Sequence, residues 1–152
     1  MPKVAILLGS KSDEDAMRGC MEYLSQFGIP YDLKVSSAHR QPDETASFIR
    51  DAENNGYALI IAAAGMAAHL PGFAASQTIL PVIGVPLDGS PLHGVDALYS
   101  IVQMPAGVPV ATVAIGSAGA RNAAVLAAEI LGLHDPAVKQ KLVEFKKNGA
   151  KF

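Results

Sequence analysis

The sequence predicts an α/β protein in which helices cover both faces of a five-stranded parallel sheet. Short apolar runs alternate with segments of helical periodicity along the whole chain. The runs are apolar throughout instead of at every second residue, which is typical of strands buried on both faces. Strict alternation of strands and helices favours a doubly wound, flavodoxin-like parallel sheet. The five expected strands are Val4–Leu8, Tyr31–Val35, Leu59–Ala63, Val82–Val85 and Val110–Ile115.

Local signals set the bounds of the first two helices. Ser12 is expected to cap the first helix, because the acidic residues 13–15 follow it and complement the positive end of a helix. Gly28 ends that helix. Pro42 opens the second helix, since proline suits a first helical position, and the Asn-Asn-Gly at 54–56 ends it.

The later helices follow the third, fourth and fifth strands. One is expected after Pro71, a short one at about Val95 to Val102, and an alanine-rich one from about Ala118 to Leu131. Asp135-Pro136 then starts a polar C-terminal helix, from about 136. No linker or internal repeat interrupts this order, so we expect residues 1–152 to form a single domain.

Charged residues are scarce and unevenly distributed. They make up 17% of the chain, against about 25% in a typical domain. From Asn54 to Ala120 the only charged side chains are Asp88 and Asp96. A domain of this size still exposes about a third of its unfolded-chain surface, so this block predicts burial against other copies of the chain. The formal net charge of -2, without a basic stripe, argues against nucleic acid or an anionic membrane as the main partner.

The sequence also predicts a cytoplasmic location. A lone Cys20 cannot form an internal disulfide, which fits a reducing compartment. The apolar run at Val4–Leu8 is too short for a signal peptide. The longest apolar stretch, Tyr57 to Leu70, falls short of the roughly 20 residues that a membrane helix needs. We therefore expect neither secretion nor membrane insertion.

Polar residues gather in the loops that follow the expected strands, where open parallel sheets bind ligands. The loop from Gly9 to Asp13 offers a glycine, two hydroxyls and a helix N-terminus, which together suit a phosphate. Asp13 would repel a phosphate, so we expect it to bind ribose hydroxyls while Ser10 and Ser12 hold the phosphate. An ordinary helix cap explains the segment equally well. The glycine spacings of ATP-binding and dinucleotide-binding loops are absent.

The loop after the second strand places a proton-transfer group beside an anion-binding group. Histidine titrates near pH 6.5 and suits proton transfer, while arginine binds phosphate through two parallel hydrogen bonds. His39 and Arg40 are adjacent, and Ser37 adds a hydroxyl. A solvated surface loop remains the alternative, but the position of this loop at the ligand-binding edge favours a site.

His69 lies in an almost uncharged segment of small residues, so we expect its ring to be at least partly desolvated. Small residues permit close approach of the backbone to a ligand, and exposed N–H groups there suit a small carboxylate or carbon dioxide. A buried histidine bonded to a backbone carbonyl is the alternative. The four histidines lack paired ligand spacing, so no metal site is expected. Cys20 falls within a helix and is expected to pack, not to act as a nucleophile.

Four motifs in order resemble the N5-carboxyaminoimidazole ribonucleotide mutase family (class I PurE) of de novo purine biosynthesis. They are Gly-Ser-Lys-Ser-Asp at 9–13, Ser-Ala-His-Arg at 37–40, Ala-Ala-His-Leu-Pro-Gly at 67–72 and Ser-Ile-Val-Gln-Met-Pro at 100–105. The resemblance implies a flavodoxin-like three-layer sandwich, a homo-octamer and no cofactor. It also implies that a carboxylate moves from the exocyclic nitrogen of a ribonucleotide substrate to ring carbon 4, giving 4-carboxy-5-aminoimidazole ribonucleotide.

The resemblance also assigns roles to residues. His39 would shuttle the proton and Asp13 would bind the ribose. The 5'-phosphate would be held by Ser10, Ser12, Ser37 and Arg40. The pocket that retains carbon dioxide would be formed by Ala64, Gly65, Ala68, His69 and Leu70.

Two other functions stay open. A related carboxylase has the same fold and uses free carbon dioxide, but Arg40 and His69 favour the mutase. A non-catalytic nucleotide-binding module would need the anion-binding loops but not His39. The chain departs from the mutase pattern at Ala63, Met66 and Gln41, which touch the edge of the pocket.

Overall fold

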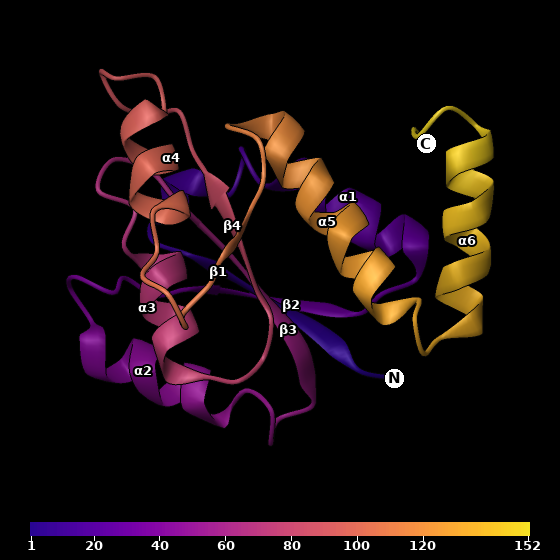
Figure 1. Ribbon diagram of the computed structural model, residues 1–152, viewed down its shortest axis with the longest axis horizontal. Coiled ribbons are helices and arrows are strands. Elements are labelled where there is room, and N and C mark those ends of the chain that lie inside the picture. Colours follow the sequence, from indigo (N-terminus) through magenta and orange to yellow (C-terminus); the bar gives the residue numbers. More distant parts are fainter.

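Five parallel strands form one sheet in the order β2-β1-β3-β4-β5 in the computed structural model, which describes residues 1–152. Helices cover both faces, so the molecule has three layers (Figure 1). This confirms the predicted flavodoxin-like α/β fold. The strands are β1 (Lys3–Leu8), β2 (Tyr31–Val35), β3 (Tyr57–Ala64), β4 (Val82–Pro86) and β5 (Ala111–Thr112).

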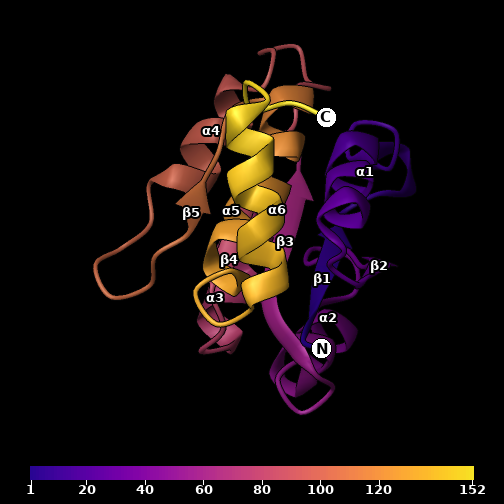
Figure 2. The ribbon, with the colours of Figure 1, turned by 90° about the vertical axis from the view of Figure 1, so that its right-hand side faces the viewer.

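Each face of the sheet packs against its own set of helices. One face is covered by α1 (Arg18–Phe27), α5 (Ser117–Leu131) and α6 (Pro136–Lys147). The other is covered by α2 (Pro42–Asp51), α3 (Leu70–Gln77) and α4 (Val95–Val102). Figure 2 shows α6 as the outermost helix of the first set.

Strand β1 shows why the central strands are apolar at every position. Val4, Ile6 and Leu8 pack with α1, α5 and α6, whereas Ala5 and Leu7 pack toward the opposite helices. All five side chains are fully buried. Successive side chains of a strand point to opposite faces, so a strand covered on both sides buries all of them.

The predicted start of the first helix is wrong. Ser10, not Ser12, is the capping residue: its Oγ accepts a hydrogen bond from the N–H of Ser12 and opens a short 3-10 helix at Lys11–Asp13. Turns follow, and α1 begins only at Arg18. Ser10 and Ser12 both have the residue type preferred at an N-cap, so the sequence alone does not decide which of them caps the helix. Gly28 ends α1 as predicted, in a left-handed conformation with φ 74°.

The fifth strand is much shorter than predicted. It pairs with β4 at only two positions, Ile83 with Ala111 and Gly84 with Thr112. Strand β5 lies at the edge and has a partner on one side only, and β4 ends at Pro86, which has no N–H to extend the ladder. Asp135 caps α6 through hydrogen bonds from the N–H groups of Ala137 and Val138, which confirms the predicted start of the C-terminal helix.

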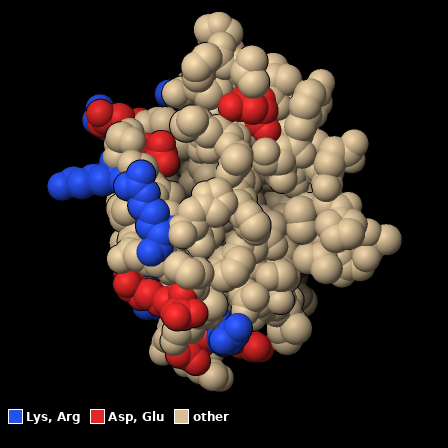
Figure 3. Space-filling model, turned by 90° about the vertical axis from the view of Figure 1, so that its left-hand side faces the viewer, with Lys and Arg blue, Asp and Glu red and all other residues tan.

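The uncharged middle of the chain leaves large apolar side chains on the surface of the isolated molecule. Figure 3 shows the side that carries α3 and α4, where charged residues gather toward one edge and most of the face has none. The exposed apolar residues from this part of the chain are Met66, Ile79, Leu92, Val95, Tyr99 and Val102. None of the helices has both the length and the apolar character that crossing a membrane requires.

Candidate active site

A cavity of about 780 Å³ opens at the carboxyl ends of the strands. The register of the sheet brings the loops together there, because Leu8 lies beside Val35 and Ala63, and Ala64 lies beside Pro86. Ten of the eleven residues predicted for the site line this cavity. They are Ser10, Ser12, Asp13, Ser37, His39, Arg40, Ala64, Gly65, His69 and Leu70.

Ala68 is the one predicted residue that does not line the cavity. Its side chain is fully buried and packs with Leu70 and Ala74 in the core beneath α3. Alternation of exposed and buried residues over the loop explains this, since Ala67 and His69 on either side are exposed. Ala68 therefore supports the wall of the cavity from behind.

The serine loop after β1 presents hydroxyl groups that are not fully used within the protein. The Oγ atoms of Ser10 and Ser12 lie 2.9 Å apart, so one hydroxyl donates to the other. The second hydroxyl keeps its proton for a ligand. Lys11 lies between them, lines the same cavity and forms no ion pair. An anion in this loop would meet hydroxyl donors and an ammonium group together.

Asp13 is the acidic group of the serine loop and is half-buried. Burial raises its pKa above the usual 3.8, and a backbone hydrogen bond with Ser10 opposes the shift. A carboxylate accepts hydrogen bonds, so Asp13 suits sugar hydroxyls better than a phosphate.

The loop after β2 carries the second set of donors. Ser37 Oγ accepts a hydrogen bond of 3.1 Å from the Arg40 N–H, which leaves the hydroxyl proton of Ser37 free to donate to a ligand. The side chains of His39 and Arg40 are exposed, and Arg40 forms no ion pair. The guanidinium is therefore available to an anion entering the cavity.

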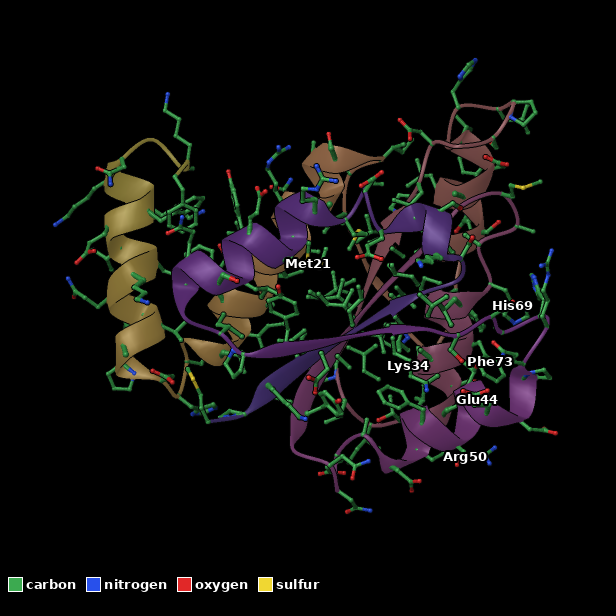
Figure 4. The ribbon with its side chains drawn as sticks, turned by 180° about the vertical axis from the view of Figure 1, so that it is seen from behind. Met21, Lys34, Glu44, Arg50, His69 and Phe73 are labelled. Carbon is green, nitrogen blue, oxygen red and sulfur yellow. The ribbon has the colours of Figure 1, made fainter.

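Two histidine rings meet at the edge of the cavity. The rings of His39 and His69 lie 5.3 Å apart between centroids and are nearly perpendicular, at 88°. The ring of Phe73, on α3, lies 6.1 Å beyond that of His69. Figure 4 shows His69 and Phe73 on the same side of the sheet as Glu44 of α2, and Met21 of α1 on the opposite side. The His69 side chain projects from the start of α3 and is exposed in the isolated chain, with the rings of His39 and Phe73 beside it.

Comparisons with known proteins identify the family of this chain. The model of the family described as AIR carboxylase matches residues 3–151. The chain belongs to the AIR carboxylase family. A relative from Escherichia coli, named N5-carboxyaminoimidazole ribonucleotide mutase, is 54% identical and covers 95% of this chain and 86% of its own. One of the same name from Saccharolobus solfataricus is also 54% identical and covers 97% of this chain and 92% of its own.

Solved structures support the same family. The crystal structure of Treponema denticola PurE superposes with a TM-score of 0.89 at 30% identity, over 99% of this chain and 92% of that one. A 3-dehydroquinate dehydratase-like protein from Bifidobacterium longum has a TM-score of 0.55 at 19% identity, which reflects a shared fold alone.

This member of the AIR carboxylase family has a second, smaller cavity of about 330 Å³ that shares His39, Ala67 and His69 with the first. Ser100 and Met104 also line it, which brings the Ser-Ile-Val-Gln-Met-Pro segment beside the two histidines. The other lining residues are Gly72, Phe73 and Ser76. The fourth sequence motif therefore adjoins the same site as the first three.

Gly9, Gln41 and Met66, which the sequence placed in or beside these loops, also line the cavity. Other lining residues were not singled out from the sequence: Lys11, Val35, Ala38, Ala67, Leu87 and Gly89. The signal for Lys11 was its place between two serines at a phosphate-type loop. Met66 adopts φ 56°, a left-handed conformation that favours glycine. The departure from the mutase pattern at Met66 thus falls where the backbone itself favours glycine.

Metal and thiol chemistry find little support in these residues. No three His, Cys, Asp or Glu side chains come together to hold a metal ion. Cys20 is fully buried in α1, as predicted, and burial raises its pKa to about 12. A thiol with that pKa is protonated at neutral pH and is a poor nucleophile.

Proposed function

We propose that this chain is an N5-carboxyaminoimidazole ribonucleotide mutase. The enzyme transfers the carboxylate of its substrate from the exocyclic nitrogen to ring carbon 4, giving 4-carboxy-5-aminoimidazole ribonucleotide. The observation that carries the proposal is the larger cavity, in which His39 lies beside the anion-binding loops. Relatives that are 51–54% identical over nearly the whole chain and bear the mutase name support it.

The two anion-binding loops hold the 5'-phosphate. Ser10, Ser12 and Ser37 donate hydroxyl protons, and Arg40 donates two parallel hydrogen bonds from its guanidinium. Lys11 adds a second positive charge at the same cavity. Asp13 accepts hydrogen bonds from the ribose hydroxyls. These contacts leave the base of the substrate directed toward His39 and His69.

His39 moves one proton in each half of the reaction. As the imidazolium, it protonates the exocyclic nitrogen while the nitrogen–carboxyl bond breaks, which releases carbon dioxide and the neutral amine. Ring carbon 4 then attacks the carbon dioxide, and the neutral imidazole removes the proton from that carbon. The histidine ends in its starting form, so substrate and product differ only in the position of the carboxylate.

The carbon dioxide must stay beside the ring, because it would be lost to water faster than a weak carbon nucleophile could capture it. Ala64, Gly65 and Leu70 line the cavity next to His69 and offer small or apolar surface. We expect them to retain carbon dioxide through proximity and exclusion of water. Ala68 supports this wall from the core.

We further propose that the folded unit, residues 1–152, assembles as a homo-octamer and acts in the cytoplasm. Exposed Ile79 and Tyr99, at 87% and 63%, are large apolar side chains that association would cover. Light scattering of the purified protein tests this assembly. A mass of eight chains is expected, and a monomer at assay concentration would contradict it.

The activity is tested by offering the purified enzyme two alternative substrates without ATP or added metal. We expect N5-carboxyaminoimidazole ribonucleotide to be converted, and aminoimidazole ribonucleotide with bicarbonate to react poorly. The reverse preference would identify a carboxylase, the activity for which the matching family model is named. Binding of the ribonucleotide without turnover of either substrate would indicate a non-catalytic module.

A further inference from the structure

Behind the loop that carries His39, two buried hydroxyls connect the end of β2 to the first turn of α2. Ser36 and Thr45 are both fully buried, and their hydroxyl oxygens lie 2.5 Å apart. The Thr45 hydroxyl also donates to the backbone carbonyl of Ser37, at 3.2 Å. A threonine hydroxyl has only one proton, so Ser36 must be the donor to Thr45. The hydrogen bonds therefore run in one direction, from Ser36 through Thr45 to the backbone of Ser37.

These hydrogen bonds close the base of the loop. The Ser37 carbonyl accepts a second hydrogen bond, of 2.8 Å, from the Gln41 N–H, which uses both of its lone pairs. The Ser36 N–H donates to Leu8 O at 2.9 Å and so fixes the loop to β1. Helix α2 has no side-chain cap, and Thr45 is its only side chain that bonds to residues 36–40. The loop from Ser37 to Gln41 is thus held at both ends.

Lys34 makes two other side-chain contacts that join β2 to α2. Its Nζ lies 5.2 Å from the centre of the Phe48 ring. Lys34 and Glu44 form an ion pair of 3.3 Å, and Figure 4 shows these residues close together. The Glu44 side chain is about half exposed, at 56%, and exposed ion pairs contribute little to stability. The buried hydroxyls form the stronger constraint, because an unsatisfied hydroxyl in the interior is costly.

We propose that the Ser36–Thr45 hydroxyl pair is a positioning device that holds the His39–Arg40 loop in its catalytic arrangement. Neither residue lines the cavity, so both act through the backbone. His39 forms no side-chain hydrogen bond and its one aromatic contact is with the ring of His69, so the position of its side chain depends on the loop backbone. The inference rests on the proposed role of His39 as the proton shuttle.

The test compares kcat and KM of Thr45→Val with those of Thr45→Ser. Valine keeps the shape of threonine but neither donates nor accepts a hydrogen bond, whereas serine keeps the hydroxyl. A 1 Å misplacement of a catalytic group lowers the reaction rate about 100-fold. Because the Gln41 N–H still holds the loop in Thr45→Val, we expect a smaller displacement and a fall in kcat of about 10-fold. Thr45→Ser is expected to stay within about 2-fold of the parent, because its hydroxyl can make the same bonds.

A double variant tests whether the two hydroxyls act as a unit. Ser36→Ala combined with Thr45→Val is expected to be no slower than Thr45→Val alone, because the second substitution removes a donor whose acceptor is already gone. If kcat of the double variant falls by the product of the two single-variant factors, the two hydroxyls do not act as a unit. If Thr45→Val fails to fold, Ser36→Ala alone carries the test, and wild-type kcat and KM in that variant would overturn the proposal.

Two matched controls separate positioning from general loss of stability. Ile49→Val removes a methylene from a fully buried side chain one turn further along α2. Lys34→Met removes the charged contacts of Lys34 with Glu44 and with the Phe48 ring, which join the same two elements. Both should keep the kcat of the parent, although Ile49→Val lowers Tm. The proposal is overturned if Thr45→Val has wild-type kinetics, or if Ile49→Val loses as much kcat at an equal drop in Tm.

His39→Asn, measured in parallel, distinguishes failure of the positioning role from failure of the proposed proton shuttle. An inactive His39→Asn beside a fully active Thr45→Val would overturn the positioning role alone. A fully active His39→Asn would overturn the proposed shuttle, and the positioning role with it.

Discussion

Replacement of His39 by asparagine tests the proposed proton shuttle most sharply among the substitutions of the cavity. Asparagine is polar and fits the same space, but it does not exchange a proton near neutral pH. The His39 side chain is exposed and forms no side-chain hydrogen bond, and its one aromatic contact is with His69 at 5.3 Å. Loss of such a contact costs at most about 1.5 kcal/mol, so the variant should fold and assemble normally.

The effect on catalysis should be far larger. General acid–base catalysis contributes about 10² to 10⁴-fold for one proton transfer, which corresponds to about 2.7 to 5.4 kcal/mol of barrier. His39 is assigned two transfers, so we expect kcat to fall at least about 10²-fold. The assay is the initial rate of formation of 4-carboxy-5-aminoimidazole ribonucleotide, with Tm measured on the same samples. His134→Asn is the matched control, because His134 is also exposed but lies after α5 and lines neither cavity. A His39→Asn rate within about 10-fold of the parent would refute the shuttle.

Three further predictions concern neighbouring residues. Arg40→Met should raise KM about 10- to 100-fold in steady-state kinetics, because a hydrogen bond to a charged group contributes about 1.5–3 kcal/mol. An unchanged KM would exclude Arg40 from the phosphate site. Asp13→Asn should raise Tm at pH 7. The raised pKa of Asp13 means that ionisation of its carboxyl favours the unfolded chain, so this destabilisation is present above the folded-state pKa and disappears as pH falls below 3.8. A lower Tm of the variant at pH 7 would contradict this. Met66→Gly should stabilise the protein by up to about 1 kcal/mol in urea unfolding, because the relief of left-handed backbone strain exceeds the cost of the extra conformational entropy that glycine gives the unfolded chain. A loss of stability would show that Met66 is not strained.

The sheet was predictable because burial on both faces leaves a direct mark on the sequence. Ala5 and Leu7 are as apolar as Val4 and Ile6 because both layers of helices cover β1. Strand β2, at one edge, was predicted with its exact bounds, although Asp32 and Lys34 interrupt its apolar run. Strand β5, at the other edge, was predicted too long, because its pairing with β4 ends where Pro86 lacks an N–H.

The site was predictable as far as topology determines it. Parallel strands end at one edge, so the loops with Ser10, His39 and His69 had to meet there. Burial of single loop residues was not predictable, because it depends on neighbours distant in sequence. Ala68 packs under α3 while His69 projects outward, and nothing in their local sequence separates the two. The Ser36–Thr45 contact likewise joins residues nine positions apart that no local motif links.

The central claim is that the carboxylate of the substrate reaches ring carbon 4 without leaving the cavity. The most direct test supplies unlabelled N5-carboxyaminoimidazole ribonucleotide in buffer containing carbon-13 bicarbonate, and measures the mass of the product early in turnover. We predict unlabelled product, because carbon dioxide held beside Ala64 and Gly65 recombines before it escapes. Product that carries the label from the buffer would contradict the claim and identify an enzyme that draws on free carbon dioxide.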